Sequence, residues 1–223
     1  VSGLGGGLQL IDLDGHTSVP GLLGAGTLAN NDALGTHQSA GGPSAFCFTS
    51  GHRAGETAAR EAAEIPISKV TATYINELQG RVYAPLTRAT GPLPDELQDL
   101  MLDIQGSALD AVVLNGTRFA VMLNKLDEVE LMIRKVRAPD IHELVKAYDA
   151  ESGFFTLRLC LISGQDRTES REMFYREDYP ETNDEEWFCW HTLHLSKDGI
   201  VLGKQRIPIE QFPYKPPTRD HQI

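Results

Sequence analysis

Long apolar runs are missing from this chain of 223 residues, and none approaches the roughly 20 residues that a membrane-spanning helix needs. Basic residues are also scarce: 20 Lys and Arg stand against 31 Asp and Glu, for a net charge of -11. Proteins that bind nucleic acid usually carry a basic patch, and anionic membrane surfaces attract the same kind of patch. We therefore expect neither a membrane span nor a nucleic-acid partner.

Cysteine is rare as well. Cys47, Cys160 and Cys189 are far apart and form no CxxC pair, which argues against a zinc site or a redox pair. Scattered cysteines without a secretory leader favour a reducing compartment, so we predict a cytoplasmic location. Most of the histidines show no metal-ligand spacing, and no metal site is expected. These histidines are His16, His52, His142, His191, His194 and His221.

Residues 1–65 combine a glycine-rich, apolar start with one long helix. Loose alternation over residues 8–13 and a short apolar run within residues 19–26 predict two strands. An Ala-rich helix is expected to begin near Pro43, because proline is favoured at the first helical position, and to end before Pro66.

Residues 66–165 repeat apolar side chains every three or four positions, which predicts a helical bundle. Pro85 and the stretch 91–94 are expected to break the helices, since proline removes a helical hydrogen bond. The later helices are predicted to begin at Pro94, to run over about residues 117–137, and to run from Pro139 to about residue 161.

Residues 166–223 differ in character from the bundle. Dense charge comes first, and two β-prone stretches then flank a turn at residues 196–199, which predicts a hairpin. The proline-containing stretch over residues 212–218 is expected to form an extended tail.

Three segments carry motifs that belong together. They are GGL at 6–8 with TSVPGLLGAG at 17–26, GGPS at 41–44 with GHRAGE at 51–56, and RTESR at 167–171 with YREDYP at 175–180 and DEEW at 184–187. In this order, separated by a long helical stretch, they resemble the fumarate reductase/succinate dehydrogenase flavoprotein family, which includes adenylylsulfate reductase and aspartate oxidase.

The resemblance implies an α/β plus α fold from the C-terminal part of an FAD-dependent oxidoreductase. Residues 1–65 would be the returning segment of a Rossmann-like FAD domain. Residues 66–165 would be the helical bundle, and residues 166–223 a short C-terminal segment with a hairpin and tail. Because the sequence begins at Val1 and not at Met, we expect a processed, split or truncated chain.

The resemblance also implies that the glycine pair opens a helix facing the flavin. A helix start carries a partial charge of about +0.5, and glycines let the backbone approach a flat ring closely. The residues expected to bind the cofactor are Gly26, Thr27, Ser39, Gly41, Gly42 and Ser44. His37 could orient substrate or pass a proton, or could simply be a loop histidine bonded to backbone.

Two family features are missing. Residues 3–8 fail the GxGxxG pattern because Leu8 replaces the third glycine. The diphosphate half of the FAD site would therefore come from a second polypeptide, which we favour, or from the rest of one longer polypeptide that was cleaved or split. Ser39 stands where the succinate and fumarate enzymes place an arginine that grips a carboxylate, and residues 2–5 lack their histidine. The substrate is therefore expected to be a small organic molecule other than succinate or fumarate, with a possible electron-transfer partner.

Three functions remain open at this point. The first is an oxidoreductase subunit that transfers hydride between flavin and substrate, and the second is a non-catalytic assembly or interaction subunit of a flavoprotein complex. The third is an acidic helical binding protein whose motifs match by chance. The charged motif of the C-terminal segment favours a buried or interfacial ion-pair network over a catalytic set; its members are Arg167, Glu169, Arg171, Arg176 and Asp178.

Overall fold

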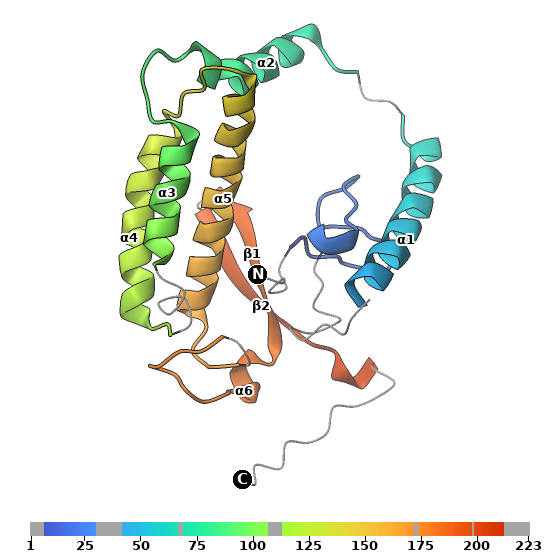
Figure 1. The fold of residues 1–223 in the computed structure, drawn as a ribbon. Coiled ribbons are helices and arrows are strands. Elements are labelled where there is room, and N and C mark those ends of the chain that lie inside the picture. The colour runs from blue at the N-terminus through green and yellow to red at the C-terminus, as the bar shows by residue number, and fades with distance from the viewer. Residues whose placement is uncertain are drawn as a thin grey trace. The chain divides into compact units, whose positions relative to one another are not determined.

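The computed structural model describes residues 7–29, 42–66, 69–106, 113–171, 174–197 and 199–211. The chain divides into two compact units, Val1–Ile75 (unit 1) and Asn76–Ile223 (unit 2). Figure 1 shows the helices and strands of both units along the chain. Within the part of the chain that the structure describes, no helix combines the length and apolar character needed to cross a membrane.

Unit 1 consists of a glycine-rich loop, residues 7–29, and the long helix α1, Gly42–Glu64, followed by the start of α2. The loop contains the short 3-10 helix η1, Gly26–Leu28. The helix begins next to Pro43 and ends before Pro66, as predicted. The two predicted strands are wrong: only the single bridges Leu8–Ala29 and His16–Leu23 form, and no ladder of neighbouring strands extends them.

Unit 2 is a helical bundle with a hairpin, which confirms the predicted helical character of this region. Its helices are α2 (Ala72–Thr87, whose first residues belong to unit 1), α3 (Pro94–Gln105), α4 (Gly116–Ile133) and α5 (Ile141–Asp166). Figure 1 shows α3, α4 and α5 side by side, and they pack on one another. Their shared core contains Leu97, Met101, Phe119, Leu126, Val129, Ala147, Ala150 and Phe154.

Pro85 does not end its helix, contrary to prediction. It lies buried in the last turn of α2, where its missing N–H cannot serve the carbonyl of Arg81. The hydroxyl of Tyr148 on α5 donates to the neighbouring Val82 carbonyl at 2.7 Å and lies 3.5 Å from that of Arg81. A side chain from another helix therefore satisfies the carbonyls beside the break.

The starts of α3 and α5 follow local signals, but the predicted end of α5 near residue 161 is too early, because the helix runs to Asp166. Pro94 opens α3, and the Asp140 side chain caps α5 by accepting the N–H of Glu143 at 2.9 Å. The predicted end of α4 is too late, because the helix stops at Ile133 and Arg137 lies beyond it, where its N–H bonds to the Pro92 carbonyl.

After α5, the one-turn helix α6 (Asp184–Trp187) leads into an antiparallel hairpin of β1 (Cys189–Ser196) and β2 (Gly199–Arg206). The hairpin and its turn are confirmed, and the short 3-10 helix η3 (Ile209–Gln211) follows. Trp187 belongs to α6 and not to a strand, because Asn183 caps that turn. The predicted tail over residues 212–218 lies outside the described residues.

Candidate functional site

The glycine-rich loop lies against one face of α1. Gly26 begins η1 with φ 66°, a left-handed conformation that favours glycine, and its N–H donates to Ser50 Oγ at 3.0 Å. A Cβ on Gly26 would lie 3.5 Å from Cys47 Sγ, and one on Gly15 would lie 3.0 Å from Ala54 Cβ. Glycine and small helix residues are what allow this close approach.

The predicted cofactor residues that the structure describes lie in η1 and in the first turn of α1; they are Gly26, Thr27, Gly42 and Ser44. Thr27 and Ser44 have exposed side chains. The contact between Gly26 and Cys47 places the η1 turn one helical turn from Ser44. The other predicted site residues, His37, Ser39 and Gly41, lie outside the described residues.

The first turn of α1 can bind an electron-rich group. The opening N–H groups of a helix have no acceptor within the helix, and together they carry a partial positive charge of about +0.5. This turn contains no acidic residue, and Ser44 and Ala45 are exposed. Backbone donors beside small, exposed side chains fit the negatively charged edge of a reduced flavin.

Unit 1 buries no large apolar side chain among its described residues. The buried residues there are small: Gly15, Thr17, Gly24, Ala29, Ala54 and Thr57. Large apolar side chains are exposed instead, with Leu13 at 78% and Phe48 at 80%. Such a unit lacks the buried apolar area that stabilises an independent domain.

His16 joins the loop to α1, and sequence reasoning missed it. Its Nδ1 lies 2.6 Å from Asp12 Oδ2 and its Nε2 lies 2.5 Å from Glu61 Oε1. The hydrogen bond with Glu61, and then that with Asp12, raises the pKa of His16 above its ordinary value despite partial desolvation. Asp12 is close to His16 in the sequence, whereas Glu61 is 45 residues away and comes close only in the folded chain.

Glu169 is the centre of an ion-pair network in unit 2. It is fully buried and accepts hydrogen bonds from Arg167, Arg171 and the Asn183 N–H. Arg171 also pairs with Asp184 at 2.6 Å. Burial alone would raise the pKa of Glu169, but these bonds lower it, so the carboxylate stays charged and has no proton to donate. This arrangement supports the structural network over the catalytic set.

Arg176 and Asp178 join the ends of two helices. The guanidinium of Arg176, 2% exposed, donates to the carbonyls of Gly164 and Gln165 in the last turn of α5 and to that of Arg167 just after it. Asp178 pairs with Arg176 and accepts the N–H of Gly116, the first residue of α4. Each charge thus lies at the helix end whose dipole it complements.

The hairpin is fastened to α5 around Trp187, which is 2% exposed. Arg167 and Lys204 lie over its ring, and its indole N–H donates to Thr168. His191 of β1 lies edge-on to the same ring, with Nδ1 2.9 Å from Ser163 Oγ on α5. Its buried Nε2 lies 3.1 Å from Asp166 Oδ2 but lacks the alignment of a hydrogen bond.

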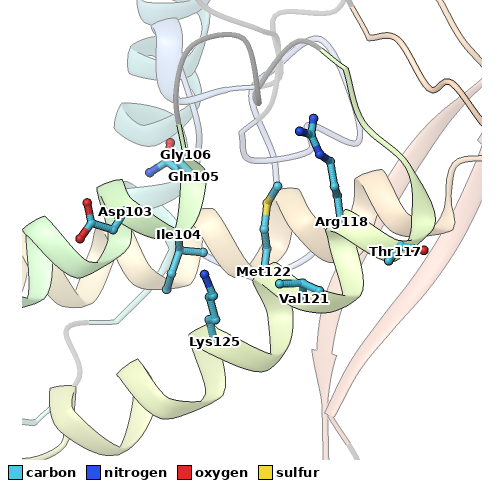
Figure 2. A pocket seen from close by; sticks show the side chains of 9 residues that line it. All are labelled: Asp103, Ile104, Gln105, Gly106, Thr117, Arg118, Val121, Met122 and Lys125. Atoms are coloured by element: carbon cyan, nitrogen blue, oxygen red, sulfur yellow. The ribbon is translucent and has the colours of Figure 1, made fainter.

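Figure 2 shows a pocket between the end of α3 and the start of α4. Its volume of about 250 Å³ is below the ~300–1,000 Å³ usual for small-molecule sites. Asp103, Arg118 and Lys125 contribute its charged side chains, and none of the predicted cofactor residues lines it. In the described part of the chain, no group of three His, Cys, Asp or Glu side chains could hold a metal ion.

Comparisons with known proteins bear on this site. The sequence model of the family described as fumarate reductase flavoprotein C-term matches residues 96–221. The fumarate reductase flavoprotein subunit of Mycobacterium tuberculosis is 26% identical over 218 residues, which cover 91% of this chain and 37% of that protein. An uncharacterized FAD-dependent oxidoreductase of Methanocaldococcus jannaschii is 29% identical over 194 residues, which cover 86% of this chain and 30% of that protein.

Solved structures share the fold, which confirms the predicted fold class. Adenylylsulfate reductase from Archaeoglobus fulgidus matches with a TM-score of 0.76 at 24% identity, covering 86% of this chain and 33% of its own. Sdh1 of Mycobacterium smegmatis in complex with UQ1 matches with a TM-score of 0.81 at 21% identity, covering 93% and 36%. This chain spans about a third of the length of the curated relatives it matches.

Proposed function

Because the chain belongs to the fumarate reductase flavoprotein C-term family, we propose that it forms the C-terminal part of an FAD-dependent oxidoreductase. The exposed first turn of α1 beside the Gly26 turn supports this role most directly. The residues proposed to contact the flavin are Gly26, Thr27, Ser39, Gly41, Gly42 and Ser44. Residues 1–65 would complete the FAD domain, residues 66–165 the bundle, and residues 166–223 the C-terminal segment.

Bound FAD would supply hydride transfer to or from an organic substrate. The chain's own contribution is to place backbone N–H groups at the electron-rich edge of the ring, where they stabilise negative charge. The glycine pair 41–42 would let the backbone approach the ring face, and His37 would orient substrate or hold a proton beside it.

A second polypeptide is proposed to carry the GxGxxG half of the FAD site, in a hetero-oligomer with this chain. Two observations support it: residues 3–8 fail that pattern, and unit 1 buries only small side chains among its described residues. The three cysteines are free thiols, which supports a cytoplasmic location.

The substrate is proposed to be a small organic molecule other than succinate or fumarate. Ser39 offers a neutral hydroxyl where gripping a carboxylate calls for a guanidinium, which binds such groups through two parallel hydrogen bonds. A separate electron-transfer partner would then reoxidise or reduce the flavin.

Purification of the chain together with its partner tests the function. Mass spectrometry should find a second polypeptide and FAD, and the complex should be yellow, with oxidised flavin absorbing near ~450 nm. An intact but colourless complex would instead favour the non-catalytic assembly subunit. A stable, colourless monomer would contradict both.

Ser44→Asp tests the role of α1 directly. An acidic residue in the first turn of a helix stabilises the helix but repels an anion bound there. We therefore expect unchanged or higher thermal stability of the apoprotein together with a lower flavin reduction potential. Thr49→Asp, at an exposed position further along α1, is the matched control and should leave the potential unchanged.

A further inference from the structure

The protonation state of His16 decides whether its ring can hydrogen-bond to two carboxylates at once. Asp12 and Glu61 lie on opposite ring nitrogens, at 2.6 Å and 2.5 Å. An imidazolium has two N–H donors and satisfies both carboxylates, whereas a neutral imidazole has one donor and one lone pair. Loss of the proton therefore sets a lone pair against one carboxylate, and one of the two contacts must open.

This contact differs in kind from the other points at which the loop meets α1. Gly26 reaches Ser50 through a neutral hydrogen bond, and Gly15 meets Ala54 by close packing. These two contacts and the His16–Glu61 pair lie along one face of α1, at positions 50, 54 and 61. Among the residues that the structure describes, the charged groups that act on His16 are Asp12 from the loop and Glu61 from α1.

Hydrogen bonds within the loop connect His16 to the segment that leads into the η1 turn. Asp12 Oδ1 accepts the N–H groups of Asp14 and His16, and the Gly24 N–H donates to the Gly15 carbonyl at 2.8 Å. The His16–Leu23 bridge closes the same loop three residues before Gly26. Release of His16 from Glu61 thus loosens the segment that presents Gly26.

We propose that protonated His16 is a positioning residue that clamps the glycine-rich loop to α1, so that the assembled protein grips its flavin less firmly once His16 loses its proton. This inference rests on the proposed function, because it assigns the Gly26 turn to the flavin site. His16 is not a catalytic residue, since it acts through the loop.

The sign of the pH dependence follows from the charge-assisted contacts. Both carboxylates favour the protonated ring, so the clamp is closed below the ordinary histidine pKa of about 6.5 and opens as pH rises through the raised value. His16 is partly exposed, at 29% of its side chain, so the effect is modest.

The first test measures FAD release from the assembled flavoprotein by the fluorescence of freed flavin, from about pH 6 to about pH 9. We expect release from the unaltered protein to become faster by on the order of fivefold as pH rises. His16→Gln, which cannot be protonated, should release FAD fast at every pH. His52→Gln on the same helix is the control, because His52 is 75% exposed and makes a looser contact, at 3.6 Å, with Glu56.

A pH-dependent release that survives unchanged in His16→Gln would overturn the clamp. If His16→Gln does not assemble, Glu61→Gln replaces the carboxylate with a neutral amide of similar shape, which can accept from the protonated ring or donate to the neutral one. The release profile of that variant should therefore also be flat with pH.

NMR titration of the His16 ring in the full chain separates this inference from the proposed function. The ring should titrate above the ordinary value and return towards it in Glu61→Gln. A complex that never carries FAD refutes the proposed function, and the titration still decides the clamp: a ring that titrates at the ordinary value in the unaltered chain overturns it.

Discussion

Replacing Arg176 with methionine should destabilise unit 2 by about 3–5 kcal/mol. The guanidinium makes five hydrogen bonds, three to carbonyls at the end of α5 and two to Asp178. Methionine fills similar space without a donor, so each carbonyl loses a charged partner worth about 1–2 kcal/mol. Asp178 is 34% exposed and regains water, which limits its own loss. Arg176 also holds the pKa of Asp178 below its usual range, and this part of the lowering should be lost while the Gly116 N–H keeps its own contribution.

Urea unfolding of the full chain, followed by the fluorescence of Trp187 and Trp190, measures the change in unit 2, to which both tryptophans belong. The expected loss corresponds to a fall in Tm of about 10 °C. Arg176→Lys keeps the charge but not the planar fork, so about half of the loss should remain. Arg134→Gln is the matched control, because Arg134 is 71% exposed and its pair with Glu130 is worth at most about 0.5 kcal/mol. A Met variant within about 1 kcal/mol of the unaltered protein would refute the helix-end account.

Three further changes test the interior of unit 2. Glu169→Gln leaves Arg167 and Arg171 without their shared charge and should cost about 3 kcal/mol, measured by the same urea unfolding; an effect below about 1 kcal/mol would contradict a network centred on Glu169. Gly164→Ala places a Cβ 2.6 Å from the Phe119 ring and should lower the free energy of unfolding by about 1–3 kcal/mol. Gly80→Ala, where a Cβ meets open space, should be neutral or stabilising. Equal effects of the two substitutions would refute the packing argument. Burial lowers the pKa of His191; the charge of Asp166 opposes this shift, and those of Arg167 and Lys204 reinforce it. The stability of unit 2 should therefore fall as pH drops below about 6.5 through the lowered pKa. His191→Gln should weaken this pH dependence in urea unfolding, and an unchanged dependence would assign it to another group.

Local signals were sufficient to predict much of the architecture. Pro94 marks a helix start whatever surrounds it, because a proline ring acts within one turn. The helix predicted to begin at Pro139 begins two residues later, at Ile141, where the Asp140 side chain caps it. The hairpin followed from the turn at residues 196–199 for the same reason. Signals of this kind fail where a distant side chain decides the outcome. At Pro85, the Tyr148 hydroxyl donates to the Val82 carbonyl and lies 3.5 Å from the Arg81 carbonyl, which Pro85 leaves without its helical donor.

The candidate site divides in the same way. The start of α1 was readable from Pro43, but the contact of His16 with Glu61 depends on how the loop folds back on the helix. The ion-pair members of the C-terminal segment could be named from the charged motif that contains them. Their partners could not, because Arg176 reaches the carbonyls of α5 only when the segment after this helix folds back onto its last turn.

The small buried residues of unit 1 have a consequence for biogenesis. The bundle has its own continuous apolar core and can fold as soon as it leaves the ribosome. Folding of the loop against α1 yields little hydrophobic stabilisation, because side chains such as Leu13 and Phe48 remain exposed to solvent. If the proposed second polypeptide covers these side chains, a copy made in excess of it would expose apolar surface in unit 1 to chaperones and proteases, and the supply of both polypeptides would set the amount of intact protein.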